Sequence, residues 1–325
     1  YLKSYYYPKY YHKYSIKFDA TIILLIIMDL FKKITLFNRY IKVFTTFTVL
    51  LLSLFTVKNS YKWFISRILY LPKKIEILKL TKFQNCRIKE IKNIPKEFSL
   101  IIGHAYGSPN IKKEFLSKKI DNFLSKNIDK IENIFFTGDV FSIPSAEKWE
   151  NLNNKYGSKS NIIVAPGNHD IGIKNLQKRN IFENSDLYKK QFPFLFESDK
   201  INFIIEDSIS NNWRISPPTI NLINAQSNNS KTILLRHNIP VKEFLSLSNS
   251  NAGYKNGLLS KQKLDSLLNK DVIIISGDGG AFSNLPRFFC HQFGKITFII
   301  NGIGEVSGDS IVLLVNNSIF RYELN

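Results

Sequence analysis

The sequence has only two cysteines among its 325 residues, Cys86 and Cys290. They are far apart, and neither belongs to a C-x-x-C pair. A disulfide framework or a structural zinc cluster is therefore not indicated. We expect both to be unpaired thiols, buried or idle, in a reducing compartment.

Methionine is scarcer still, since Met28 is the single one. The sequence begins with Tyr1. The stretch before Met28 is rich in Tyr and Lys and is typical of neither a signal peptide nor a packed element. Two interpretations stay open. Residues 1–27 are either a non-native or disordered extension upstream of a start at Met28, or the beginning of a fragment of a longer protein.

Acidic residues are also few, 26 against 45 Lys and Arg, and the formal net charge is +19. The excess is uneven: residues 1–100 hold 19 basic and 5 acidic residues, and the remainder holds 26 and 21. A polynucleotide groove in the C-terminal part is not indicated, so we expect no nucleic-acid partner. Attraction of the basic N-terminal end to anionic lipid headgroups fits the asymmetry better.

An uncharged apolar run extends from Val43 to Val57, bounded by Lys42 and Lys58. It is somewhat shorter than the roughly 20 residues of a full crossing, but its basic flanks suit headgroups on both sides. No small-residue cleavage site follows it. We expect residues 28–60 to be a single-pass membrane anchor, with a buried helix of a soluble domain as the alternative, and residues 61–97 to be a basic connector. Because both flanks are basic, the side of the membrane that the catalytic domain faces stays open.

From Phe98 onward, short apolar runs alternate with polar stretches. Such runs, ending in Gly, Asp, Asn or His, predict buried strands. The predicted strands are 99–104, 134–139, 161–166, 201–207, 232–237, 271–277 and 296–301. A helix is predicted at 111–126, and a closing hairpin at 311–315 and 319–322. Residues 98–325 therefore predict an α/β domain with functional groups at the C-terminal ends of its strands.

Glycines and polar side chains recur where these strands end. In chain order they are Gly103-His104, Gly138-Asp139, Gly167-Asn168-His169-Asp170, Arg236-His237 and Gly277-Asp278. Glycine lets the backbone turn tightly and approach a bound group closely. Imidazole, carboxylate and amide oxygen together suit Mn, Fe, Zn or similar divalent ions. Because these groups converge only if a sheet aligns them, their ordered recurrence is the informative signal.

This ordered set resembles the calcineurin-like metallophosphoesterases. Their pattern is Asp-x-His, Gly-Asp-x-x-Asp, Gly-Asn-His-Asp/Glu, a later His, and Gly-His-x-His. The most specific stretch here is VAPGNHD at 164–170, with Thr137-Gly138-Asp139 upstream. The resemblance covers about residues 98–325 and implies the family's αββα sandwich of two mixed β-sheets flanked by helices.

Carried over to this chain, the resemblance implies a role for each matching residue. Asp139 would bridge two metals, and Asn168 and His237 would bind the second of them. His169 would be the catalytic residue beside the leaving group, and Asp170 would give structural support.

The chain departs from the family pattern at several positions. His104-Ala105-Tyr106 stands where the family has Asp-x-His, Ser142 replaces the second Asp, and Gly280 replaces the final His. His104 and Asp278 remain candidate ligands, whereas Tyr106 is a poorer ligand unless it ionises, with an ordinary pKa of about 10. The losses are concentrated on one metal, so we expect one or two divalent ions, Mn, Fe or Zn.

The predicted metal ligands are therefore His104, Asp139, Asn168, His237 and Asp278. Arg236 is the candidate for holding a substrate phosphate through its bidentate guanidinium, with a surface salt bridge as the alternative. The predicted function is a membrane-anchored, metal-dependent phosphoric ester hydrolase with a metal-activated water. Its substrate would be a small phosphorylated molecule or a lipid-linked phosphate. The alternatives are a catalytically impaired protein that binds a phosphorylated ligand or a partner, and an active branch with its own metal preference.

Overall fold

The computed structural model describes residues 85–108, 115–173, 175–198, 201–227, 230–240, 270–281 and 288–324, with Leu25, Thr48, Glu243 and Leu267. The chain divides into two units, Tyr1–Tyr70 and Leu71–Asn325. All helices and strands described below belong to the second, called here the C-terminal unit. Nearly all of the predicted extension and anchor, and residues 61–84 of the predicted connector, lie outside the described residues. Within the described part of the chain, no helix has the length and apolar character needed to cross a membrane.

Two mixed six-stranded sheets form the centre of the C-terminal unit. The first has the order β1-β12-β11-β2-β3-β4 and the second the order β5-β6-β7-β8-β10-β9. The strands of the first sheet are β1 Lys89–Glu90, β2 Phe98–Ile102, β3 Ile131–Phe136, β4 Asn161–Val164, β11 Ser310–Val315 and β12 Ser318–Glu323. Those of the second are β5 Phe194–Ser198, β6 Ile201–Ile205, β7 Lys231–Arg236, β8 Val272–Ser276, β9 Phe288–Phe293 and β10 Ile296–Asn301. Strands β2, β3 and β4 are parallel, and so are β6, β7, β8 and β10.

The helices begin at polar residues that cap their first turn. Ser117 precedes α3 (Lys118–Asn127), Ser145 precedes α4 (Ala146–Leu152), Asn175 precedes α6 (Leu176–Glu183) and Ser216 precedes α7 (Pro217–Ala225). The short α5 spans Asn168–Ile171, a π-helical turn spans Asn153–Gly157, and 3-10 turns span Ile128–Lys130 and Asp278–Ala281. The helix predicted at 111–126 is therefore present from Lys118 onward; residues 115–117 precede it, and 109–114 are not described.

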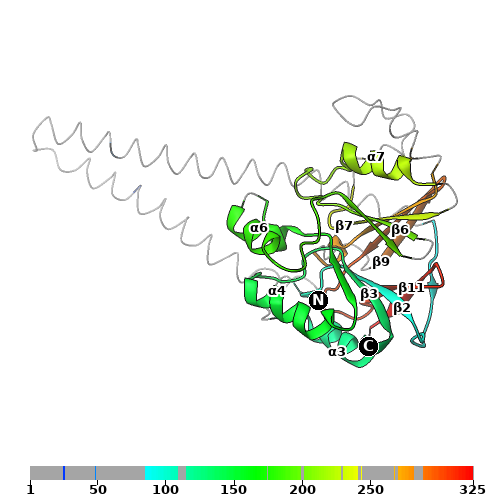
Figure 1. The fold of residues 1–325 in the computed structure, drawn as a ribbon, viewed down its shortest axis with the longest axis horizontal. Helices are drawn as coiled ribbons and strands as arrows, with labels where there is room; N and C mark the ends of the chain where they lie inside the picture. The colour runs from blue at the N-terminus through cyan, green and yellow to red at the C-terminus, as the bar shows by residue number, and fades with distance from the viewer. Residues whose placement is uncertain are drawn as a thin grey trace, which may run out of the picture. The chain divides into compact units, whose positions relative to one another are not determined.

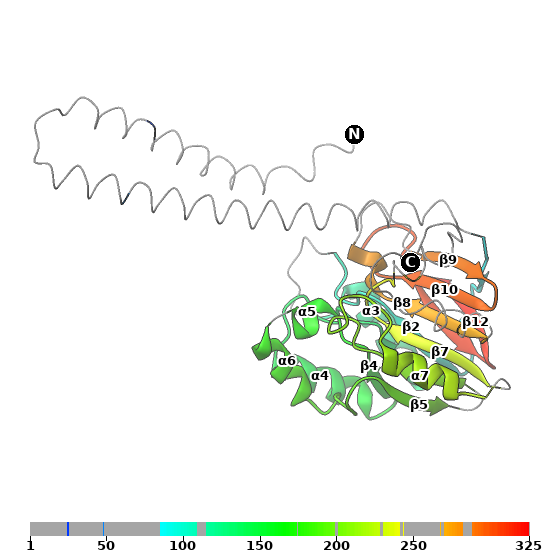
Figure 2. The same ribbon diagram turned by 90° about the horizontal axis from the view of Figure 1, so that it is seen from above.

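Neighbouring residues on the inner strands face opposite cores, as the two-residue period of a strand requires. Ile101 and Phe135 pack between the sheets, where Phe135 stacks on Phe203 with ring centroids 4.3 Å apart. Ile134 packs on the outer side against α3 and α4, and Leu234 packs under α7. Figure 1 shows the resulting layers as α7, the sheet with β6 and β7, the sheet with β2 and β3, and then α3 and α4; Figure 2 shows α7 over β7 from above. The predicted sandwich of two mixed sheets flanked by helices is confirmed.

All seven predicted strands and the closing hairpin are present. The hairpin turns through Asn316 and Asn317, whose φ angles of 47° and 64° suit the two-residue turn that joins twisted strands. Strands β1, β5 and β9 were not predicted. All three lie at sheet edges. These three strands are exposed or unevenly buried, so their sequences lack a continuous buried apolar run.

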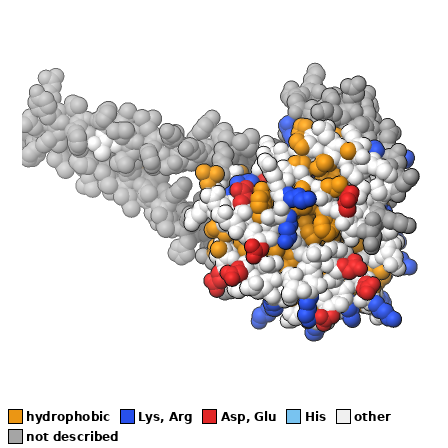
Figure 3. Space-filling view, in the orientation of Figure 1, with side chains coloured by type: hydrophobic (Ala, Val, Ile, Leu, Met, Phe, Trp, Pro, Cys, Tyr) orange, Lys and Arg blue, Asp and Glu red, His pale blue; other side chains and the backbone are white. Residues whose placement is uncertain are grey.

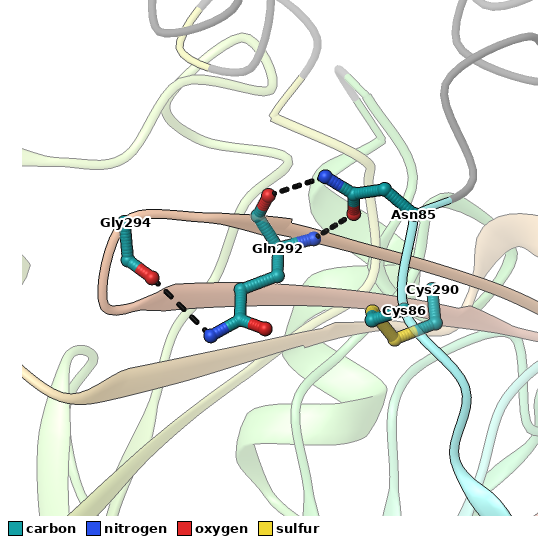
Figure 4. Close-up of a disulfide and its surroundings, with 5 residues drawn as sticks. All are labelled: Asn85, Cys86, Cys290, Gln292 and Gly294. Carbon is teal, nitrogen blue, oxygen red and sulfur yellow. Dashed lines mark hydrogen bonds between the residues drawn. A yellow bond between two sulfur atoms is a disulfide. The ribbon is translucent and has the colours of Figure 1, made fainter.

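Cys86 and Cys290 form a disulfide, with their Cα atoms 5.4 Å apart, so the prediction of two unpaired thiols was wrong. Asn85 lies against the edge strand β9: its Nδ2 donates to the carbonyl oxygen of Gln292 at 2.9 Å, and the backbone N–H of Gln292 donates to Asn85 Oδ1 at 2.7 Å (Figure 4). Because 204 positions separate the two cysteines, only the fold brings them together.

Reduction of this disulfide is expected to lower the free energy of unfolding by about 2–5 kcal/mol, because the bridge closes a long loop in the unfolded chain. Thermal unfolding with and without a reductant measures the effect. In the double variant Cys86→Ala/Cys290→Ala, the melting temperature should already be low and should not respond to the reductant. A wild-type melting temperature insensitive to reduction would contradict a stabilising bridge.

The surface of the C-terminal unit carries charges of both signs. On the face shown in Figure 3, acidic and basic side chains are interspersed, and apolar side chains gather across its middle. This distribution agrees with the small charge excess of residues 101–325 and gives no basic stripe on that face.

Candidate metal centre

The five strand-end motifs meet where the two sheets converge. The N–H of Gly277 donates to the carbonyl oxygen of Arg236 at 3.1 Å, which extends the pairing of β7 and β8 beyond the strands. His237 Nδ1 lies 3.1 Å from the carbonyl oxygen of Thr137 and so links the second sheet to the first. His104 and Asp139 have positive φ angles of 52° and 55°. Such strain in non-glycine residues is typical of functional sites.

Four predicted ligands surround one point. His237 Nε2 lies 3.5 Å from Asp139 Oδ1, 3.6 Å from Asp278 Oδ1 and 3.2 Å from Asn168 Oδ1. The ligand atoms of Asp139, His237 and Asp278 all lie within 4.8 Å of one another, and all three residues are buried. This group of two carboxylates and an imidazole can hold a metal ion.

Two histidines direct the same ring nitrogen at Asp139. His104 Nδ1 lies 3.1 Å from the carbonyl oxygen of Ile303, and His237 Nδ1 lies against that of Thr137. A carbonyl oxygen only accepts, so both rings carry a proton on Nδ1. In each ring Nε2 then faces the Asp139 carboxylate, and His104 Nε2 is 3.7 Å from Oδ2 of that group. Metal-binding histidines characteristically donate their other N–H to a carbonyl or a carboxylate.

The charges of the cluster also favour a cation. Burial raises the pKa of Asp278 to about 6, although His237 opposes the rise. Burial disfavours ionised Asp139 as well, but the neighbouring imidazoles of His237 and His104 bring its pKa below the ordinary value. Burial lowers the pKa of His104 to about 4. A divalent ion would neutralise the two buried carboxylates, so the donor set fits such an ion in both chemistry and charge.

Asp170 supports the centre and does not join it. Its carboxylate accepts backbone N–H bonds from Asp139 at 2.7 Å, Gly167 at 2.8 Å and Val140 at 3.0 Å. These bonds hold the turn after β3 against the turn after β4. The contacts are those expected of the supporting role that the family resemblance implies.

A second supporting pair was missed from the sequence. Asn238 Nδ2 donates to Asp278 Oδ2 at 3.2 Å, and Ser208 Oγ donates to Asn238 Oδ1 at 3.2 Å. Asn238 directly follows His237 at the strand end, which was the available signal. Nothing in the sequence indicated Ser208, because 30 positions separate it from Asn238.

His169 lies at the rim of the cluster. Its backbone N–H donates to Asp139 Oδ1 at 2.9 Å, and its Nδ1 lies 2.9 Å from the carbonyl oxygen of Ser142. The side chain is partly exposed, whereas His104 and His237 are fully buried. Nε2 is therefore the ring atom left for a ligand.

Arg236 is not brought into the centre. Its side chain is fully buried, lies 3.1 Å from Glu206 in an ion pair, and donates to the carbonyl oxygen of Trp213 at 2.7 Å. His237 faces the cluster, and adjacent residues of an extended strand point to opposite sides. The prediction that Arg236 holds a substrate phosphate is therefore not supported.

Gly138→Ala is expected to weaken binding of a divalent ion at least about tenfold, as is typical when the support of a ligand is disturbed. A Cβ at Gly138 would lie 2.5 Å from His237 Nδ1, and Gly138 has a φ of +83°. Gly308→Ala is the matched control, because Gly308 has a φ of +82° and nothing within 4 Å of an added Cβ. Both variants carry similar backbone strain. Equal Mn²⁺ affinities of the two variants in calorimetric titrations would contradict the packing of Gly138 against the ligand.

Comparisons with known proteins add little to this geometry. No protein-family model and no curated protein matches the chain. One matching solved structure is a conserved uncharacterized protein, a predicted phosphoesterase, from Streptococcus pneumoniae TIGR4. The two chains are 11% identical, and the match has a TM-score of 0.24. It covers 72% of this chain and 95% of the Streptococcus protein. A likeness this weak carries no argument about function, so the proposal below rests on the metal centre and its motifs.

Proposed function

We propose that the chain is a metal-dependent phosphoric ester hydrolase of the calcineurin-like type. The observation that carries this proposal is the convergence of Asp139, Asn168, His237 and Asp278 around one point. A divalent ion held by these residues would act as a Lewis acid. It would lower the pKa of a bound water and polarise a phosphoryl oxygen.

His169 is the candidate proton donor to the leaving oxygen. The bond from Nδ1 to the Ser142 carbonyl fixes its ring, so the protonated imidazolium would give its Nε2 proton to the leaving oxygen and become the neutral ring. His169 is partly exposed, so a substrate can reach its ring from solvent. General acid catalysis of this kind typically contributes about 10²–10⁴-fold to a rate.

The proposal is tested with the purified full-length chain in a mild detergent and a generic aryl phosphate. Hydrolysis should stop on chelation and return when Mn²⁺, Fe²⁺ or Zn²⁺ is added. The competing hypothesis, an impaired protein that binds a phosphorylated ligand, predicts binding without turnover. Turnover that is insensitive to a chelator would contradict the metal-dependent mechanism.

Exposed apolar side chains lie close in sequence to two motifs of the centre and bear on the proposed substrate. In the described part of the C-terminal unit, the exposed large hydrophobic residues are Ile143, Ile173, Leu176 and Val306, at 42–75% exposure. Ile143 follows β3, Ile173 follows α5, Leu176 is the first residue of α6, and Val306 follows β10. Ile143 and Ile173 therefore lie within four positions of Asp139 and Asp170 in the sequence. This placement favours an amphiphilic, lipid-linked phosphate over a small soluble one.

Lysines accompany these apolar residues. Lys148 Nζ donates to the carbonyl oxygen of Ile143 at 3.0 Å, Lys119 Nζ to that of Val306 at 3.3 Å, and Lys178 Nζ to that of His169 at 3.0 Å. Cationic and apolar groups together suit an anionic lipid surface. Phosphatidate in vesicles should therefore be hydrolysed with a higher kcat/KM than glycerol phosphate. The reverse order would favour a small soluble substrate.

We also propose that residues 28–60 anchor the chain in a membrane, supported by the apolar run Val43–Val57 and its basic flanks. The Cys86–Cys290 disulfide supports an oxidising side for the C-terminal unit, since disulfides persist in oxidising compartments. Thiol trapping in intact cells should then find no free cysteine in the chain. If the anchor is present, the chain should also resist alkaline extraction from membranes. Trapping of free thiols would contradict this orientation.

A further inference from the structure

We propose that the centre binds a single divalent ion, and that the hydroxyl group of Tyr106 takes the place of a second ion by donating a hydrogen bond to a phosphoryl oxygen. The identity of this ligand rests on the proposed function. The number of ions does not, because it follows from how the donor atoms are distributed.

The donor atoms lie unequally on the two sides of the Asp139 carboxylate. Oδ1 lies among the ligand atoms of Asn168, His237 and Asp278, so that four donors face one point. On the side of Oδ2, His104 Nε2 lies 3.7 Å away, and the described residues form no group of three His, Cys, Asp or Glu ligands that includes His104. A catalytic zinc site typically has three protein ligands besides its water. The first side reaches this number, and the second, with two donors, does not.

Tyr106 occupies the second side. Its ring centroid lies 4.4 Å from that of His104 and 5.2 Å from that of His169. The residue is 1% exposed, so this aromatic ring fills space between the buried histidine and the histidine at the rim. Because this bulky ring fills the space, the second side offers a hydrogen-bonding hydroxyl group in place of a further metal ligand.

Two buried polar atoms on this side have no hydrogen-bond partner among the described residues, namely the hydroxyl of Tyr106 and Nε2 of His104. Leaving a buried polar group unsatisfied costs about 1–3 kcal/mol, so such atoms are expected to meet a ligand. A phenol that keeps its proton is a hydrogen-bond donor and a poor metal ligand. A phosphoryl oxygen accepts hydrogen bonds and does not donate them, so it matches the hydroxyl of Tyr106.

Calorimetric titration of the metal-free, full-length chain with Mn²⁺ tests the number of ions. We expect one ion per chain, a number that His104→Gln leaves unchanged, and an affinity reduced at least about tenfold in Asp278→Asn. Two ions per chain, one of them lost in His104→Gln, would overturn the inference and leave the proposed function standing. A chain that binds no ion and hydrolyses no phosphate ester would overturn both.

Inhibition by inorganic phosphate tests the role of Tyr106. Tyr106→Phe should keep one Mn²⁺ per chain, while the inhibition constant of phosphate rises about fivefold to tenfold, the effect of one lost hydrogen bond. Tyr156→Phe is the matched control, because the Tyr156 hydroxyl is bonded to Asp121 at 2.7 Å, outside the cluster. An inhibition constant that Tyr106→Phe leaves unchanged would overturn the assignment, and so would loss of the ion in that variant.

Discussion

Replacing Asp139 by asparagine is expected to lower the rate of phosphate ester hydrolysis by about 10²–10³-fold or more. The Asp139 carboxylate lies between the two buried imidazoles, with Oδ1 3.5 Å from His237 Nε2 and Oδ2 3.7 Å from His104 Nε2. An amide removes the negative charge that a divalent ion requires at this point. The backbone bond from Asp139 to Asp170 remains in the variant, so the turn itself should keep its shape.

The matched control is Asp129→Asn, since Asp129 is 78% exposed and pairs with Lys159 on the surface. Both kcat/KM and Mn²⁺ affinity should be near the wild-type values in the control and strongly reduced in Asp139→Asn. Full activity in Asp139→Asn would remove the residue from the mechanism.

Replacing Arg236 by methionine is expected to lower the free energy of unfolding by about 3–5 kcal/mol, the usual effect of leaving one partner of a buried ion pair alone. Arg236 and Glu206 are fully buried, with Nη1 3.1 Å from Oε2. The guanidinium also donates to the carbonyl oxygens of Trp213 and Arg214, which holds the segment between β6 and α7. Glu206 in turn accepts from the N–H of Ser216 at 2.7 Å.

Chemical denaturation measures this change, and Lys159→Met is its control. The side chains of Lys159 and Asp129 are 52% and 78% exposed. Loss of this pair should therefore lower the free energy of unfolding by no more than about 1 kcal/mol. The double variant Arg236→Met/Glu206→Gln should recover part of the lost stability, because the buried charge is removed. Similar losses in Arg236→Met and Lys159→Met would contradict the importance of the buried pair.

The central part of the fold was predictable because its strands are buried on both faces. Such strands leave continuous apolar runs, and glycine with a polar residue marks where each run ends. The family resemblance carried by these motifs then implied that Asp139, Asn168, His237 and Asp278 meet, although they come from both sheets. Their convergence follows from the fact that parallel strands of adjacent sheets end at the same edge.

The remaining features depend on geometry that residue types do not encode. Edge strands such as β9 are unevenly buried, and the disulfide joins cysteines 204 positions apart. Arg236 was placed in the site because it precedes His237, but the alternation of side chains along β7 turns it toward Glu206. His104 is oriented by the backbone carbonyl of Ile303. Because any residue type offers such a carbonyl, the isoleucine at position 303 does not reveal this contact in the sequence.

The most direct test of the metal centre is elemental analysis of the full-length chain purified without added metal. We expect close to one equivalent of Mn, Fe or Zn per chain. Asp139→Asn should lose this metal, and Asp129→Asn should keep it. A wild-type chain that contains no stoichiometric metal, and takes up none when these ions are supplied, would contradict the proposed metal centre.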